Sequence, residues 1–276
     1  MAGRQGIARK STPRNLDLAA HVDSLQAEGR YTFDRREALS ALNVSPAALK
    51  KAARRLAGKH RIASPRRGFF VIVPLEYRDA GAPPASWFID PLMKHLDRPY
   101  YVALLSAAAL HGAGHHQPQE FQVITKGFLR PLTSGRSRIR FVPKRRLERT
   151  PVVEMKTDTG SLRVSTPEAT AVDLLRFLGR AGQLNTVRTV LKELAPKMTG
   201  KRLIQAAEID GSLRSIQRLG YLLDHIGETA LADGLASWLR EQSPYKVPLR
   251  SDRPYRGAPF VGRWMLYLND TVESDE

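Results

Sequence analysis

The sequence predicts a mixed α/β (α+β) protein in two parts: a small N-terminal part of helices closed by a β-hairpin, and a larger body of strands and several helices. Helical periodicity with capping residues fills residues 15–58, and strand-like runs separated by turn residues recur at 62–73 and 120–165. A Pro-, Gly- and Ala-rich stretch at residues 79–87 is the predicted linker. A chain of 276 residues is long enough for two such domains.

The N-terminal part begins with a basic arm at residues 1–14, which shows no periodicity and is predicted to be disordered. Apolar residues at helical spacing then predict a helix over 15–28. Asp34 can cap a short helix through Leu42, and Glu37 stands where a capping box needs it.

The next helix covers residues 45–58. Ser45 can cap it, and Pro46 occupies the first position, where a missing N–H costs nothing. Ile62–Ala63 and Phe69–Val73 then read as two strands around a turn at Ser64–Gly68. The order of these elements predicts a winged helix-turn-helix domain over residues 15–78.

Helix 45–58 has an apolar face and a basic face. Leu49, Ala53 and Leu56 are expected to pack on the preceding helices. The candidate DNA-binding residues are Ser45, Lys50, Lys51, Arg54 and Arg55 of the helix and Arg66 and Arg67 of the hairpin tip. Lys and Arg contact phosphates, and Arg can also contact guanine with two hydrogen bonds. The alternative is a basic surface helix that is merely solvated.

The second domain, at residues 88–276, begins with an apolar stretch that predicts a helix ending at Gly112. Ser165 and Glu168 have the spacing of a capping box and predict the start of a further helix. The predicted strands are "EFQVIT", "RIRFV", "VVEMKT", "SLRVST" and Arg263–Leu268, and the later helical patterns lie near 183–194, 199–209, 213–226 and 228–241.

The charge is large and unevenly placed. The chain has 44 Lys and Arg against 27 Asp and Glu, a net of +17, which favours a polyanionic partner. Residues 1–78 carry 16 basic and 6 acidic side chains, and residues 130–149 carry 8 and 1, so these segments account for the whole excess. The sequence therefore predicts two anion-facing surfaces.

The second basic segment alternates basic and apolar residues. A strand there would expose Arg136, Arg138 and Arg140 on one side. The full predicted patch is Arg136, Arg138, Arg140, Lys144, Arg145 and Arg146. The alternative is an edge strand that its charges protect from pairing.

Several classes of function lack support in the sequence. The longest apolar stretch, Tyr100–Leu110, is too short to span a bilayer, and the N-terminus lacks a signal-peptide pattern. The chain has no cysteine, so we expect a cytoplasmic location without disulfides or thiolate chemistry. His95, His111, His115 and His116 cluster in the sequence without a metal-ligand signature. We therefore expect no metal, no cofactor, no membrane partner and no catalytic residues.

Four stretches in order resemble the AbiE-type antitoxins of bacterial type IV toxin–antitoxin systems. They are "YVALLSAAALHGAGHHQPQEFQVIT" (101–125), "VSTPEATAVDLL" (164–175), "RLGYLLDHIG" (218–227) and "GRWMLYLN" (262–269). The resemblance implies an antitoxin of a phage-defence locus, which counteracts a nucleotidyltransferase-like toxin and represses its own operon at operator repeats. It assigns residues 88–276 to the antitoxin domain and carries over no catalytic residue.

Two other functions remain open from the residues alone. One is a nucleic-acid-processing enzyme, for which Glu154, Asp158 and Glu168 are the nearest carboxylates to the second basic segment. The other is a winged-helix transcription regulator whose second domain binds a small ligand. The sequence leaves the oligomeric state open, either a monomer in solution or a dimer on DNA.

Overall fold

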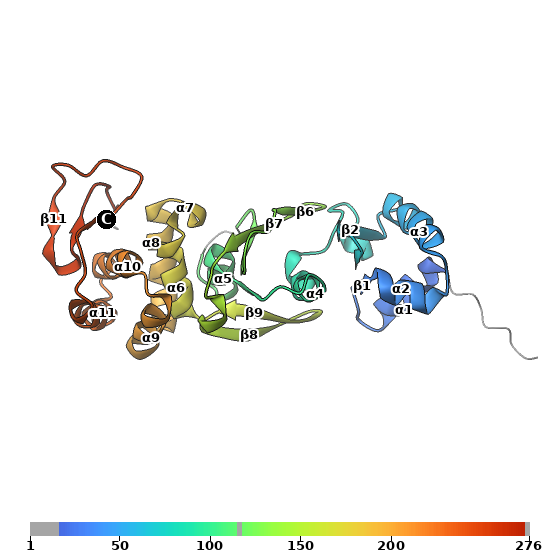
Figure 1. Ribbon diagram of the computed structural model, residues 1–276, viewed down its shortest axis with the longest axis horizontal. Helices are drawn as coiled ribbons and strands as arrows, with labels where there is room; N and C mark the ends of the chain where they lie inside the picture. The colour runs from blue at the N-terminus through green and yellow to red at the C-terminus, as the bar shows by residue number, and fades with distance from the viewer. Residues whose placement is uncertain (1–16, 115–117, 274–276) are drawn as a thin grey trace, which may run out of the picture. The chain divides into compact units, whose positions relative to one another are not determined.

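The structure is a computed structural model that describes residues 17–114 and 118–273, and it divides into two compact units at Pro83–Pro84 (Figure 1). The predicted arm at residues 1–14 lies outside the described residues. The fold is mixed α/β, as the sequence predicts.

The first unit has the element order of a winged helix. Its elements are α1 (Leu18–Ala27), β1 (Thr32–Asp34), α2 (Arg35–Leu42), α3 (Pro46–Gly58), β2 (Ile62–Arg66) and β3 (Phe69–Ile72). The strands pair antiparallel in the order β1-β3-β2. The three helices pack around a core that includes Val22, Leu49 and Ile72.

Local capping signals place these helices where the sequence predicts them. The Asp34 carboxylate accepts a hydrogen bond from the Glu37 amide at 2.8 Å and caps α2. Asn43 ends α2 in the left-handed conformation, at φ 49°, which makes the turn into α3. The hairpin differs in one detail: β2 continues to Arg66 through an irregularity after Ala63, so the turn is shorter than predicted.

The predicted linker at residues 79–87 is partly structured. Ala85–Trp87 forms a short 3₁₀ turn, and Ala82 and Ala85 are buried. Pro and Ala side chains are small and apolar, so such a segment can pack as well as link.

The second unit is built on a six-stranded mixed sheet in the order β6-β7-β5-β4-β9-β8. Its strands are β4 (Tyr100–Val102), β5 (Phe121–Thr125), β6 (Leu132–Ser134), β7 (Ser137–Pro143), β8 (Val152–Thr157) and β9 (Gly160–Ser165). β4 pairs parallel with β9 and antiparallel with β5, and β5 pairs parallel with β7. The predicted β8–β9 hairpin is present.

The predicted apolar helix ending at Gly112 is wrong at its start. Tyr100–Val102 is the strand β4, and only Leu104–Leu110 is helical, as α5. All three residues of β4 are buried, so the strand lacks the apolar–polar alternation that would separate it from a buried helix.

The helices of this unit gather on one side of the sheet (Figure 1). They are α6 (Pro167–Arg176), α7 (Leu178–Ala181), α8 (Leu184–Leu194), α9 (Gly200–Asp210), α10 (Leu213–His225) and α11 (Thr229–Glu241), while α4 (Ile89–His95) contacts β9. Buried α6 contacts α5, α8, α9 and α10 and is the centre of this layer. Its cap is Thr166, which accepts from the Ala169 amide, and not Ser165 as predicted.

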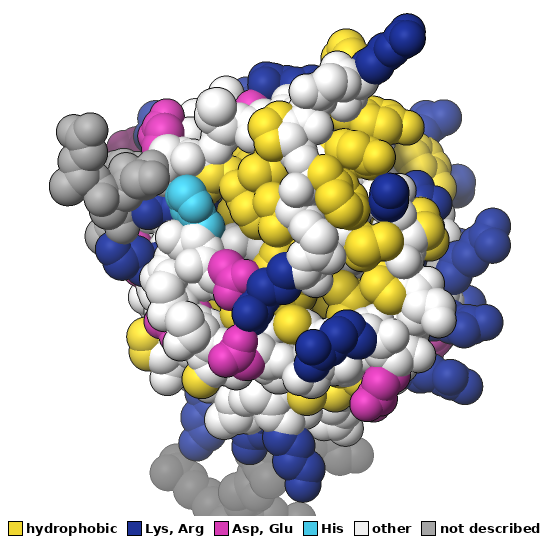
Figure 2. Space-filling model, turned by 90° about the vertical axis from the view of Figure 1, so that its left-hand side faces the viewer, with side chains coloured by type: hydrophobic (Ala, Val, Ile, Leu, Met, Phe, Trp, Pro, Cys, Tyr) yellow, Lys and Arg dark blue, Asp and Glu magenta, His cyan; other side chains and the backbone are white. Residues whose placement is uncertain are grey.

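The chain ends in a small sheet, in the order β10-β12-β11, from β10 (Val247–Pro248), β11 (Phe260–Val261) and β12 (Leu266–Tyr267). The predicted strand Arg263–Leu268 is therefore only partly present, since Gly262–Trp264 forms a 3₁₀ turn. On the face of the unit that carries β11, hydrophobic side chains gather at the centre and Lys and Arg side chains lie around them (Figure 2).

Candidate nucleic-acid interface

Helix α3 separates its side chains into a buried face and a basic face. Ser45 caps the helix by accepting from the Ala48 amide at 3.2 Å, and Pro46 follows at the first position. Leu49, Ala53 and Leu56 are buried, as predicted. The four basic residues Lys50, Lys51, Arg54 and Arg55 are exposed.

These four charges have no acidic partner among the residues that the structure describes. Lys50 and Arg54 are four residues apart, as are Lys51 and Arg55, and like charges at this spacing repel by a few tenths of a kcal/mol. A helix that keeps two such repulsive pairs on its exposed face gains from a polyanion that neutralises them. The small residues Ala47 and Ala48 on the first turn are exposed and leave room for close approach.

The hairpin brings two further arginines next to its turn. Arg66 ends β2 and Arg67 lies in the turn, where Gly68 adopts φ +79°. The hydroxyl of Ser64 donates to the carbonyls of Arg66 and Phe69 and so braces the turn. Arg67 is exposed and Arg66 is half-buried.

The second basic segment does not form the single patch that the sequence predicts. Lys144 is buried, with its side chain 7% exposed, and forms ion pairs with Asp173 at 2.8 Å and Asp210 at 3.2 Å. Arg140 is half-buried and forms a two-pronged ion pair with Glu120, which lowers the pKa of that carboxyl. Both residues are therefore removed from the anion-binding surface.

The remaining arginines of the segment lie near opposite ends of β7. Arg136 is in the β6–β7 turn and Arg138 is near the start of β7, whereas Arg145 and Arg146 follow its end. A strand rises about 3.3 Å per residue, so about 30 Å of backbone separates Arg136 from Arg145. The alternative of an edge strand is also wrong, since β7 pairs on both sides with β6 and β5.

A buried polar network crosses the second unit. The Tyr101 hydroxyl donates to Asp173 at 2.8 Å, Lys144 bridges Asp173 and Asp210, and Arg176 pairs with Asp210 at 2.7 Å. Burial raises the pKa of Tyr101 and of Asp173, and the Lys144 ammonium opposes the rise for Asp173. The sequence analysis does not predict this network. One residue could have indicated it, because Asp173 is an acid within the apolar stretch of α6.

The network is closed to a substrate. The cavity beside Lys144 and Asp210 measures about 10 Å³, at the lower limit for one water molecule. The carboxylates that an enzyme would need beside the basic segment do not converge either. Glu154 is exposed on β8, Asp158 accepts from the Trp87 indole, and buried Glu168 accepts from the Thr199 amide.

The histidines do not form a metal site in the described part of the chain. No three His, Cys, Asp or Glu residues there could hold a metal ion, and His115 and His116 lie outside it. His111 lies at the end of α5, and its Nε2 contacts the Ser165 carbonyl at 2.7 Å. Burial lowers the pKa of this imidazole.

Two of the four sequence stretches that carry the resemblance meet around one tryptophan. Trp264 is fully buried, and its indole N–H donates to Asp224 at 2.6 Å. Gly220 lies directly beneath the ring. Arg263 pairs with Asp224 at 3.0 Å and with Asp233 at 2.6 Å. These residues hold the C-terminal segment on α10 and are structural.

The chain is similar to known proteins in sequence and in fold. Residues 101–225 match the family model of the AbiEi antitoxin C-terminal domain. The crystal structure of the RV2827C protein from Mycobacterium tuberculosis has the same fold, with a TM-score of 0.66 and 18% identity over 90% of this chain and 89% of that chain. No curated protein matches. No helix within residues 17–114 and 118–273 is long and apolar enough to cross a membrane. The matched segment holds the whole Tyr101–Asp173–Lys144–Asp210 network, and this part of the chain is similar to the C-terminal domain of AbiEi antitoxins.

Proposed function

We propose that this protein is a type IV antitoxin that counteracts a nucleotidyltransferase-like toxin and represses its own operon by binding promoter DNA. The antitoxin family match supports the first activity. The observation that carries the second is α3, whose four exposed basic side chains lack acidic partners among the described residues. Both activities belong to the cytoplasm, where the operon lies.

In this proposal α3 enters the major groove of the operator. Lys50, Lys51, Arg54 and Arg55 bind phosphates and base edges, and the apolar face holds the helix on α1 and α2. The Ser45 hydroxyl accepts from an amide within the helix, so its proton is available for a phosphate oxygen. Arg66 and Arg67 contact the sugar–phosphate backbone beside the groove.

The second unit adds a smaller DNA contact. Because Arg140 and Lys144 are paired inside the unit, the exposed pair Arg136 and Arg138 is the best candidate for it. Arg145 and Arg146 are also exposed but follow the other end of β7. A single winged helix buries limited area, so added contacts or a dimer on inverted repeats would raise its specificity.

The toxin-neutralising activity belongs to the second unit in this proposal. The family match lies wholly within residues 84–276. The proposal requires only that the toxin be counteracted, either by direct contact or through another route.

The test of operator binding compares two variants that each lose four positive charges. One replaces Lys50, Lys51, Arg54 and Arg55 by Ala; the control replaces the exposed residues Lys156, Lys201, Arg202 and Arg240 of the second unit. In a gel shift with the promoter fragment, the first variant should lose binding and the control should keep it. Fluorescence titration should show that each lost phosphate contact flattens the slope of log K against log salt by about 0.9.

The result that contradicts this interface is clear. If the α3 variant keeps the circular dichroism spectrum and the operator affinity of the wild type, α3 is only a solvated basic helix. An equal loss of operator affinity in both variants would indicate a general effect of net charge.

A further inference from the structure

The second unit contains an arginine-lined hollow that the proposed function does not use. Two adjoining pockets, of about 320 Å³ and about 670 Å³, share Arg176, Phe177, Arg218 and Ser251 in their lining. They lie between the end of α6, the start of α10 and the segment after β10. Together their walls include five arginines and one acidic residue, Asp252.

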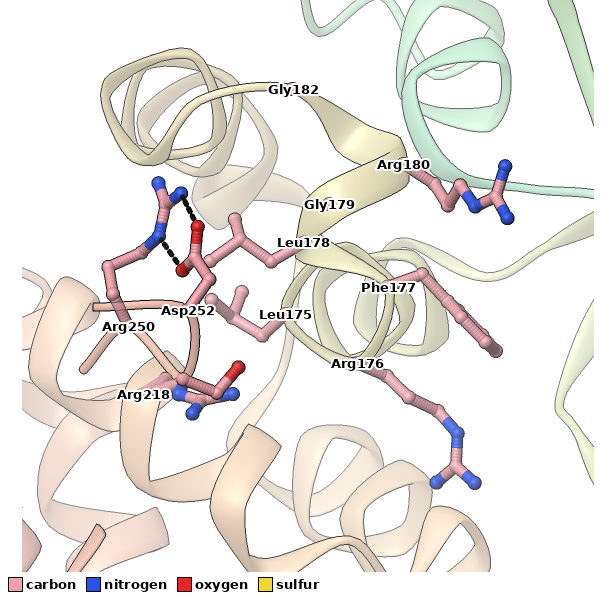
Figure 3. A pocket seen from close by; sticks show the side chains of 11 residues that line it. Leu175, Arg176, Phe177, Leu178, Gly179, Arg180, Gly182, Arg218, Arg250 and Asp252 are labelled. Carbon is pink, nitrogen blue, oxygen red and sulfur yellow. Dashed lines mark hydrogen bonds and ion pairs between the residues drawn. The ribbon is translucent and has the colours of Figure 1, made fainter. Parts of the chain in front are cut away.

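Two of the five arginines are neutralised within the protein. Arg250 pairs with Asp252 and Asp270, and Arg176 pairs with Asp210. Figure 3 shows the Arg250–Asp252 pair on one flank, above Arg218, while the Arg176 and Arg180 side chains point to the other flank. Arg180, Arg214 and Arg218 have no carboxylate within ion-pair distance in the described chain.

Arg218 is the unusual member of the set. It lies on α10, is only 9% exposed, and donates from Nε and Nη2 to a single acceptor, the Pro248 carbonyl, at 3.3 and 3.0 Å. Its Nη1 has no acceptor among the described residues, and the side chain lines both pockets. Burying a guanidinium without an anion is costly. Burial lowers its pKa, and Arg214 and Arg250 add repulsion.

The start of α10 adds donors to the same hollow. The first amides of a helix have no acceptor within it and carry its positive dipole end. In α10 these are the amides of Leu213 and Arg214, because the Ser215 amide already donates to the Ser212 carbonyl at 2.9 Å. Ser212 stands at the cap of this 13-residue helix, but its hydroxyl bonds the Ser215 hydroxyl at 2.8 Å and caps no amide. Ser212, Ser215 and Arg214 all line the larger pocket.

An aromatic ring completes the site. Tyr245 is 51% exposed, and its hydroxyl accepts from the Nε of Arg214 at 2.8 Å. The Arg214 guanidinium lies 5.8 Å from the centre of the ring and is held in place by both contacts. A planar base can stack on an exposed ring of this kind.

We propose that this hollow binds a nucleoside phosphate, with Arg214, Arg218 and the first amides of α10 on the phosphates and Tyr245 against the base. The ligand supplies the anion that buried Arg218 lacks. A hollow of about 670 Å³ is also larger than a lone phosphate needs and lies within the range of small-ligand pockets. The same phosphate-ester chemistry occurs in a free nucleotide and in a nucleic-acid chain; we assign the site to the free nucleotide.

The experiment is calorimetric titration of the full-length protein with ADP, pyrophosphate, adenosine and the dinucleoside monophosphate ApA. ADP should bind, pyrophosphate should bind more weakly, and adenosine should give no heat. ADP should also raise the thermal unfolding midpoint, because it binds the folded state only.

Exposed Arg214 is the residue to change, because loss of buried Arg218 can unfold the protein. Arg214→Gln should weaken ADP binding about tenfold or more, the effect of one charge-assisted hydrogen bond. Arg240→Gln removes the same charge on the exposed face of α11 and should change the ADP affinity less than twofold.

Three outcomes would overturn the proposal. They are no heat and no midpoint shift with millimolar ADP, equal ADP affinity in Arg214→Gln and wild type, and pyrophosphate binding as tight as that of ADP. Tighter binding of ApA than of ADP would assign the hollow to a nucleic-acid chain and overturn the free-nucleotide assignment. None of these results depends on operator binding or toxin neutralisation, so they leave the proposed function untouched.

Discussion

At Gly220 the missing side chain leaves the space that the ring of Trp264 occupies. A Cβ there would lie 2.0 Å from the ring, and the fully buried indole cannot move away freely. Gly220→Ala should therefore lower the free energy of unfolding by about 1–3 kcal/mol, despite the better helix propensity of Ala. Urea denaturation measures this loss.

Gly234 on α11 provides the matched control for this substitution. A Cβ at Gly234 would meet only Ile204, at 3.9 Å, which is an ordinary contact. Gly234→Ala should therefore be neutral or stabilise by up to about 1 kcal/mol. Equal effects at the two glycines would show that the ring of Trp264 yields easily.

The half-buried imidazole of His111 should make stability depend on pH. Because burial lowers its pKa below the ordinary value of 6.5, the unfolded chain takes up a proton there before the folded chain does. The contribution of His111 to the free energy of unfolding is therefore present above pH 6.5 and is lost as the pH falls below that value. The thermal unfolding midpoint should therefore fall more between pH 7.5 and pH 5.5 in the wild type than in the His111→Gln variant.

At the scale of elements, the β2–β3 hairpin should position the protein on DNA without reading its sequence. Replacing Arg66 and Arg67 by Ala removes contacts to the sugar–phosphate backbone, so affinity should fall by a similar factor for operator and scrambled DNA. Competition gel shifts compare the two. A changed base preference would show that the hairpin reads bases.

The elements that the sequence predicts well are those with local signals. Ser45 and Pro46 mark the start of α3 within two residues, and the pattern of Leu49, Ala53 and Leu56 marks its buried face. Strand β4 was missed because a strand with every side chain buried has the same composition as a buried helix.

The candidate sites depend on contacts that sequence spacing does not reveal. Lys144 lies 29 residues from Asp173 in the sequence, and its sequence neighbours are basic. Nothing near Lys144 in the sequence therefore indicates that its side chain is buried. The arginine-lined hollow likewise brings together α6, α10 and the segment after β10. The count of charges therefore identifies the exposed basic side chains of α3. It overestimates the number of basic side chains available on the surface of the second segment, because Arg140 and Lys144 are paired with acidic residues.

For the whole molecule, the two units should separate the two activities. Each unit has its own hydrophobic core, so fragments cut at Pro83–Pro84 should fold. Residues 1–83 should bind the operator weakly and fail to neutralise the toxin, whereas residues 84–276 should retain neutralisation. Co-expression with the neighbouring toxin gene in a growth assay tests this, and rescue by the N-terminal fragment would contradict it.

The Lys144 network also constrains how related chains can diverge. Loss of Lys144 alone would leave Asp173 and Asp210 buried beside one another without their shared cation, a change that typically costs about 3–5 kcal/mol. Replacement of the whole cluster by apolar residues of similar volume can be neutral. Homologous chains should therefore either keep the three residues together or lose them together, and the evolutionary histories of these positions, just after β7, on α6 and at the end of α9, should be linked.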